Sequence, residues 1–131
     1  MSDIKSMVRY GIVSAVYPER ATARVAFADR DNLVSAELPV LQSFGLKNRS
    51  YRLPDIGESV VCLCPANDDS NGGFVIGSFY HDNAEPPTKS HDVSMMKFSD
   101  GTSLSYDRAS HELKIEVKGR LRIKAERVDI N

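Results

Sequence analysis

The stretch Leu113-Lys114-Ile115-Glu116-Val117-Lys118 alternates strictly between apolar and charged side chains. Successive side chains of a β-strand point to opposite faces of the sheet, so this pattern predicts a strand with one apolar and one charged face. After Gly119 the same alternation continues over 121–125. It then shifts by one residue, and the shift predicts a turn or bulge near Arg127.

Two further short runs, 95–99 and 102–106, precede this stretch and flank Asp100-Gly101, a dipeptide typical of a tight β-hairpin. The tail from residue 93 onward is therefore predicted to be a small sheet with one apolar face. Isolated sheets of this size are marginally stable in water, so the apolar face needs a partner. The partner is either the rest of the chain or further copies of the same tail packed around an axis.

The segment before the tail favours self-association. Residues 81–92 have few apolar side chains and contain the pair Pro86-Pro87, a composition typical of an extended, semi-rigid linker. Such a linker holds the tail away from the N-terminal part. We therefore expect an intertwined trimeric β-helix or β-prism whose shared interior is formed by Leu113, Ile115, Val117, Leu121, Ile123, Ala125, Val128 and Ile130.

The N-terminal part is also predicted to be β-structure, which makes the whole chain all-β. Strands are expected at 8–17, 21–28, 33–38, 58–64 and 74–80, separated by turns rich in Gly, Pro, Asp and Asn. Pro39 is expected to end the third strand, and residues 40–57 form a long irregular excursion before the fourth. Five short strands with one long excursion suit a small closed barrel of the oligonucleotide/oligosaccharide-binding (OB) type. The predicted domains are thus 1–80, a linker at 81–92, and 93–131.

Composition limits the functions that the chain can have. Its 131 residues include 17 basic and 18 acidic side chains, for a formal net charge of −1. This balance argues against a protein built mainly to coat nucleic acid or an anionic membrane. No apolar run approaches the length of a membrane-spanning helix, and the N-terminus does not resemble a signal peptide. We therefore expect a protein that is made and kept in a cytosol, or one that is exported by something other than a signal peptide. Cys62 and Cys64 lie one residue apart on a predicted strand, which indicates buried, reduced thiols.

No residue pattern indicates an enzyme, a metal site or a cofactor. His81, His91 and His111 share no spacing of a metal site, and no nucleophile or phosphate-binding motif occurs. Three copies of one histidine could still meet on an axis, which spacing within one chain does not exclude.

The main alternative function is nucleic-acid binding by the predicted barrel. The segment Lys47-Asn48-Arg49-Ser50-Tyr51-Arg52 combines basic and aromatic side chains, as single-strand binding sites do. However, residues 1–93 contain 9 basic and 12 acidic side chains, and that excess of negative charge opposes a phosphate-binding groove. We expect Lys47, Arg49, Tyr51 and Arg52 to contact a neighbouring subunit instead, because Arg and Tyr are favoured in protein interfaces.

Several segments resemble the phage baseplate assembly protein V family. Leu53-Pro54-Asp55-Ile56-Gly57-Glu58-Ser59-Val60-Val61 is similar to that family's Pro-x-x-Gly-Glu/Asp-x-Val strand entry, and Gly73-Phe74-Val75-Ile76-Gly77-Ser78-Phe79-Tyr80 resembles its Gly-x-Val-x-Gly-x-x-Tyr strand. The segments 11–16 and 38–41 are similar to its first and third barrel strands. Phe98-Ser99-Asp100-Gly101-Thr102 and Tyr106-Asp107 resemble the start of its C-terminal spike.

The resemblance implies the central spike of a contractile injection machine: a phage tail, a tailocin or a related system. In that family an OB-like barrel meets the baseplate hub under the tail tube, and a trimeric β-helical needle is driven into the target cell envelope. It therefore implies a homotrimer in a virion or tailocin baseplate, with hub proteins as partners and Lys47, Arg49, Tyr51 and Arg52 as candidate contacts. The chain lacks the His-x-His pair with which many members bind a tip iron, and its pattern stops at Ile130-Asn131. A longer native chain and a separate tip protein are both open.

Overall fold

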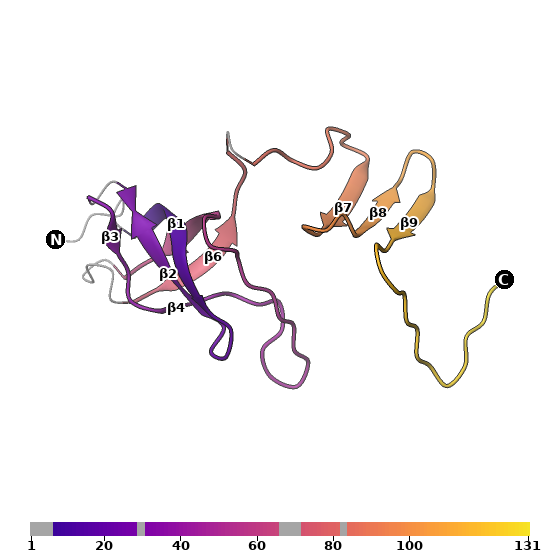
Figure 1. Ribbon diagram of the computed structural model, residues 1–131, viewed down its shortest axis with the longest axis horizontal. Coiled ribbons are helices and arrows are strands. Elements are labelled where there is room, and N and C mark those ends of the chain that lie inside the picture. The colour runs from indigo at the N-terminus through magenta and orange to yellow at the C-terminus, as the bar shows by residue number, and fades with distance from the viewer. Residues whose placement is uncertain (1–6, 29–30, 66–71, 82–83) are drawn as a thin grey trace. The chain divides into compact units, whose positions relative to one another are not determined.

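The computed structural model describes residues 7–28, 31–65, 72–81 and 84–131. It is all-β with antiparallel sheets, as the sequence predicts, and no α-helix occurs among these residues. The chain divides into two compact units, Met1–Ala84 and Glu85–Asn131, at a boundary inside the predicted linker. The strands are β1 Val8–Tyr17, β2 Thr22–Phe27, β3 Leu33–Val34, β4 Leu38–Pro39, β5 Ser59–Leu63, β6 Phe74–Ser78, β7 Val93–Lys97, β8 Ser103–Asp107 and β9 Glu112–Glu116 (Figure 1).

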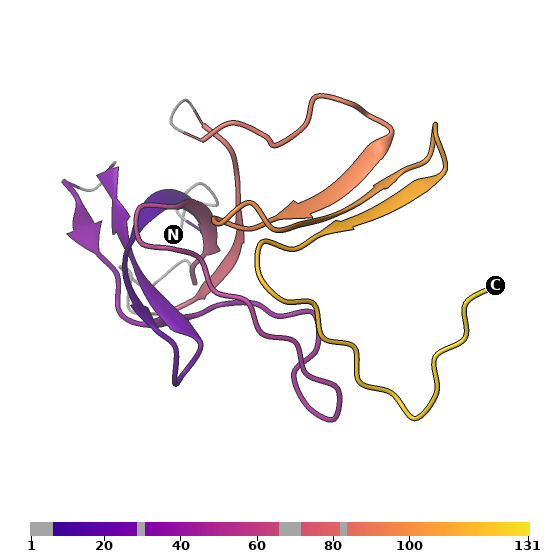
Figure 2. The ribbon, with the colours of Figure 1, turned by 45° about the vertical axis from the view of Figure 1, so that its right-hand side comes forward.

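The sheet of the first unit closes on itself. Its strand order is β3-β2-β1-β5-β6, with β4 paired to β2. Directly after β4, Val40 forms a parallel bridge with Val75 of β6, and the Leu41 amide donates to the Val75 carbonyl at 3.0 Å. The ring β2–β1–β5–β6–β4 is thereby completed, and its strands curve around one interior (Figure 2).

The core of this unit lies inside the ring and is built mainly from small and β-branched side chains, with one leucine and one aromatic ring. At Gly11, β1 lies close to β2, which is possible because glycine has no side chain. A Cβ added at Gly11 would lie 2.7 Å from the carbonyl oxygen of Ala26. Cys62 and Cys64 are buried and free, as predicted. The buried apolar residues are Val13, Ala23, Val25, Phe27, Leu38, Val60, Cys62, Cys64 and Val75.

The third predicted strand, 33–38, differs from the structure, which forms two short strands separated at Ser35. Ser35 is buried; its amide donates to the Val25 carbonyl at 2.8 Å, and its hydroxyl accepts from the Val25 amide at 3.0 Å. The side chain thus takes the place of a ladder carbonyl and interrupts the strand. The second of these strands, β4, ends at Pro39, which is itself paired with Thr22, one residue beyond the predicted end at Leu38.

The second unit begins as an antiparallel meander of β7, β8 and β9. Its first turn is at the predicted Asp100-Gly101: Gly101 has φ +95°, and the Asp100 carboxylate accepts a hydrogen bond from the Thr102 amide at 2.8 Å. That bond lowers the pKa of Asp100 below its ordinary value. The meander is followed by residues 117–131, which form no strand among the described residues.

Candidate self-association surface

One face of the β7–β8–β9 sheet is apolar and open to solvent. Leu104 pairs directly with Ile115, and Tyr106 pairs with Leu113, so these four side chains share a face. Met96 of β7 extends the same face because it pairs with Leu104. All five side chains are exposed in the single chain, with Leu113 at 66%.

The tail after β9 exposes a second apolar stripe. Every residue from 111 to 131 is exposed, including Ile123 at 70% and Ile130 at 91%. The backbone bends at 118–119 and again at 126, close to the turn predicted near Arg127, and is otherwise extended (Figure 1). No backbone–backbone hydrogen bond joins residues 119–131 to any described residue.

The predicted trimer-core residues therefore fall into two groups. Leu113 and Ile115 lie on the exposed sheet face, with Val117 directly after it, whereas the others lie on the tail that has no sheet partner: Leu121, Ile123, Ala125, Val128 and Ile130. Reasoning from the sequence missed Met96, Leu104 and Tyr106. Their place on the face of Ile115 and Leu113 depends on the observed register, in which Met96 pairs with Leu104 and β8 pairs in turn with β9.

Along β9 and the tail that follows it, the side chains between the apolar residues are charged. On β9, Lys114 lies 3.1 Å from the Glu116 carboxylate, and this hydrogen bond raises the Lys114 pKa. From Lys118 to Lys124, every second residue is Lys or Arg, with no acidic residue between them. These charged side chains discourage nonspecific pairing of the exposed strand edge.

Such a surface is unusual for a chain that stays alone. Contiguous exposed apolar patches mark interaction sites, and backbone amides without partners favour pairing with another strand. The apolar side chains recur with a period of two along an extended backbone, which suits pairing of β-strands between chains. The exposed face and tail therefore have the geometry that pairing with a strand of another chain requires.

A second exposed feature lies on the first unit. Residues 41–53, here called the finger, project from the sheet between β4 and β5 (Figure 1). The Gln42 side chain bonds both the amide and the carbonyl of Arg52, at 2.9 and 2.8 Å, and Ser50 donates from its amide to the Phe44 carbonyl at 3.1 Å. An isolated bridge between Gly45 and Arg49 narrows the tip.

All four predicted contact residues belong to the finger and are exposed. Arg49 donates to the Leu46 carbonyl at 2.8 Å within the finger, and the Tyr51 hydroxyl donates to the Pro18 carbonyl at 3.1 Å. Lys47 is exposed near the tip, and Arg52 lies at the base. The finger was predicted to be irregular, but these bonds give it a defined conformation.

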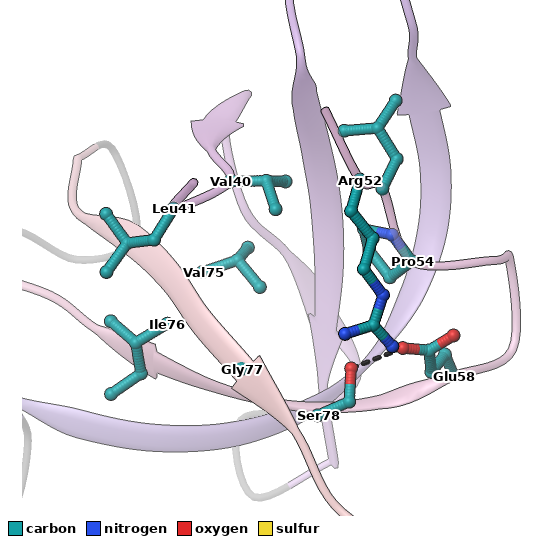
Figure 3. Close-up of a pocket in the computed structure, with 10 residues that line it drawn as sticks. Val40, Leu41, Arg52, Pro54, Glu58, Val75, Ile76, Gly77 and Ser78 are labelled. Atoms are coloured by element: carbon teal, nitrogen blue, oxygen red, sulfur yellow. Dashed lines mark hydrogen bonds between the residues drawn. The ribbon is translucent and has the colours of Figure 1, made fainter. Parts of the chain in front are cut away.

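A small hollow lies beside the base of the finger. It measures about 130 Å³, below the usual size of a small-molecule site, and the side chains of Arg52, Glu58 and Ser78 converge at one end (Figure 3). The Ser78 hydroxyl donates to the Glu58 carboxylate. The remaining lining is mainly apolar.

Within 7–28, 31–65, 72–81 and 84–131, no group of three His, Cys, Asp or Glu side chains could hold a metal ion. Nor do these ranges form a helix long and apolar enough to cross a membrane. The chain matches no protein-family model, and none of the curated proteins matches its sequence.

Proposed function

We propose that this protein is the structural central spike of a contractile tail baseplate, in a phage or a tailocin. Three copies form one spike. The first unit is an OB-like barrel that caps the tail tube and contacts the hub proteins. The tails of the three copies form a β-helical needle that pierces the target cell envelope when the sheath contracts.

The observation that carries the proposal is the complete exposure of residues 111–131 together with their apolar alternation. Trimer formation buries this stripe and gives the unpaired backbone hydrogen-bond partners. An intertwined trimer unfolds only when three chains separate, so its unfolding is slow. Slow unfolding suits an element that transmits force.

Two further features support the proposal. The ring of the first unit closes through a parallel bridge beside a long excursion, an arrangement compatible with a small Greek-key barrel. The sequence segments that resemble the baseplate assembly protein V family lie in both units and in the same order as in that family.

The mass of the chain in solution tests the proposal. Light scattering on the eluting protein should give three times 14.5 kDa. A mass of 14.5 kDa at high concentration, with the tail protected from proteolysis, would contradict it. In contractile particles that contain the chain, a gold-labelled antibody should mark the distal end of the tail tube.

The alternative, a nucleic-acid-binding barrel, gives different results. A single-strand site would bind labelled oligonucleotide at low salt and release it as salt rises. We expect no binding, because the finger has only three basic residues, whereas the rest of residues 1–84 carries ten acidic and five basic side chains.

A further inference from the structure

The finger is ordered although it is almost entirely exposed. Side-chain and backbone bonds from Gln42, Ser50 and Tyr51 hold it at both ends and along its length. Meanwhile Phe44 and Leu46 are 57% and 75% exposed. A segment with its conformation already set loses little entropy when it binds, so the finger is suited to contact another surface.

Charge indicates what that surface is. The finger carries Lys47, Arg49 and Arg52 and no acidic residue. The other described residues of the first unit carry five acidic and three basic side chains, and one of the three, Arg9, is buried. A basic projection on an acidic body is complementary to a second copy of the same body. In a ring of three copies, each copy presents one surface to its neighbour and a different surface to the other neighbour.

We propose that the finger of each copy binds the acidic barrel surface of the next copy around the threefold axis. This inference rests on the trimer proposed above and names the contact that joins the three bases. Asp31 and Asp55 are the expected acceptors, because both are exposed and neither forms an ion pair with a described residue. Glu19 and Glu37, by contrast, already pair with Arg20.

The apolar tip favours a protein over a nucleic acid as the occupant. Leu46 is the most exposed large apolar residue of the finger, and an aliphatic side chain offers no stacking surface to a base. In a protein interface the same side chain is buried at the centre, with Lys47 and Arg49 at the polar rim. The finger therefore resembles an interface with an apolar centre and charged edge.

Cross-linking the full-length protein tests this contact. Normal and isotopically heavy chains are refolded together, treated with a carbodiimide that joins amines to carboxylates, and digested. Lys47 is the only lysine of the finger. We expect peptides that join Lys47 of one isotope to Asp31 or Asp55 of the other.

The outcomes separate this inference from the proposed function. A trimer in which Lys47 is linked only within its own copy, or not at all, overturns the finger contact and leaves the spike intact. A monomer overturns both. A trimer with mixed-isotope links from Lys47 to the body of another copy supports both.

Charge removal gives an independent measurement. The double variant Lys47→Gln/Arg49→Gln should slow trimer association at low salt by about tenfold, and the difference should vanish at high salt, because electrostatic attraction acts mainly on the association rate. The control Lys89→Gln/Lys97→Gln removes the same charge from exposed positions of the second unit. Equal slowing by both pairs, or none by the finger pair, overturns the inference.

Discussion

Replacing Ile123 by Asp tests the association interface most directly. In the single chain Ile123 is 70% exposed and lies on a tail without backbone partners, so the change cannot unfold the single chain. Burying an isoleucine completely stabilises a protein by about 1.5–3 kcal/mol, so each copy still has about 1–2 kcal/mol to gain on assembly. The substitution removes that gain from all three copies.

The introduced carboxylates add repulsion. Three like charges about 6 Å apart, at an effective dielectric constant of about 20, repel by about 3 kcal/mol for each of the three pairs. Together with the lost burial, this exceeds 10 kcal/mol, as large as the stability of a typical domain, taken as roughly 5–15 kcal/mol. The Ile123→Asp chain should therefore be monomeric at concentrations where the parent is trimeric.

Light scattering over a range of concentrations measures this effect. Lys124→Asp is the matched control, since it places the same side chain one residue along, on the opposite side of the extended tail, and should leave the trimer assembled. Because protonation removes the repulsion, acidic buffer should restore part of the Ile123→Asp trimer. A variant that keeps the trimer mass at neutral pH would refute the placement of Ile123 in a shared interior.

Three further outcomes are expected. Burial raises the Cys62 pKa to about 12, so a thiol reagent at neutral pH should label Cys62 and Cys64 only at the rate of unfolding; immediate labelling of the native protein would contradict their burial. Gly73 has φ +121°, and an added Cβ would overlap the Leu63 carbonyl. The substitution Gly73→Ala should therefore lower the free energy of unfolding by about 2–3 kcal/mol, measured by denaturant titration. The control Gly45→Ala should change it little, because no atom of the described residues lies near the position of an added Cβ at Gly45. Deleting 93–131 should leave a first unit with an unchanged β-sheet circular dichroism spectrum and only weak association; loss of that spectrum would show that the unit depends on the tail.

The alternation of apolar side chains predicted most of the strands. The first predicted strand, 8–17, has the bounds of β1, and the hairpin at Asp100-Gly101 is where the sequence places it. These elements follow from local rules, a period of two and a glycine with positive φ. Their agreement with the structure is therefore a consequence of local chemistry alone.

Features that depend on distant contacts could not be predicted in the same way. Arg9 is buried against the Phe27 ring, at 5.6 Å, although arginine on an alternating strand is normally an outward residue. The break at Ser35 arises from a bond to Val25 across the sheet. The order of the finger depends on Gln42, whose side chain spans to Arg52, ten residues away.

The candidate interface was predicted in part. The sequence identified Leu113 and Ile115, since they alternate with charged residues within one strand. Met96 and Leu104 were missed because their place on the same face depends on the pairing of three strands. A covering of that face by other copies, as proposed, involves several chains, and one sequence can suggest it only through apolar residues that its own fold leaves exposed.

Because the tail has no backbone partners among the described residues of its own chain, its final folding in the proposed trimer depends on the concentration of chains. In the proposed trimer, a newly made chain can fold its first unit at once, but its last residues must wait until two other chains are present. Assembly therefore rises more steeply than in proportion to the amount synthesised, and scarce chains remain open to proteases. Messages translated by many ribosomes at once, which release neighbouring chains together, would yield finished molecules most efficiently.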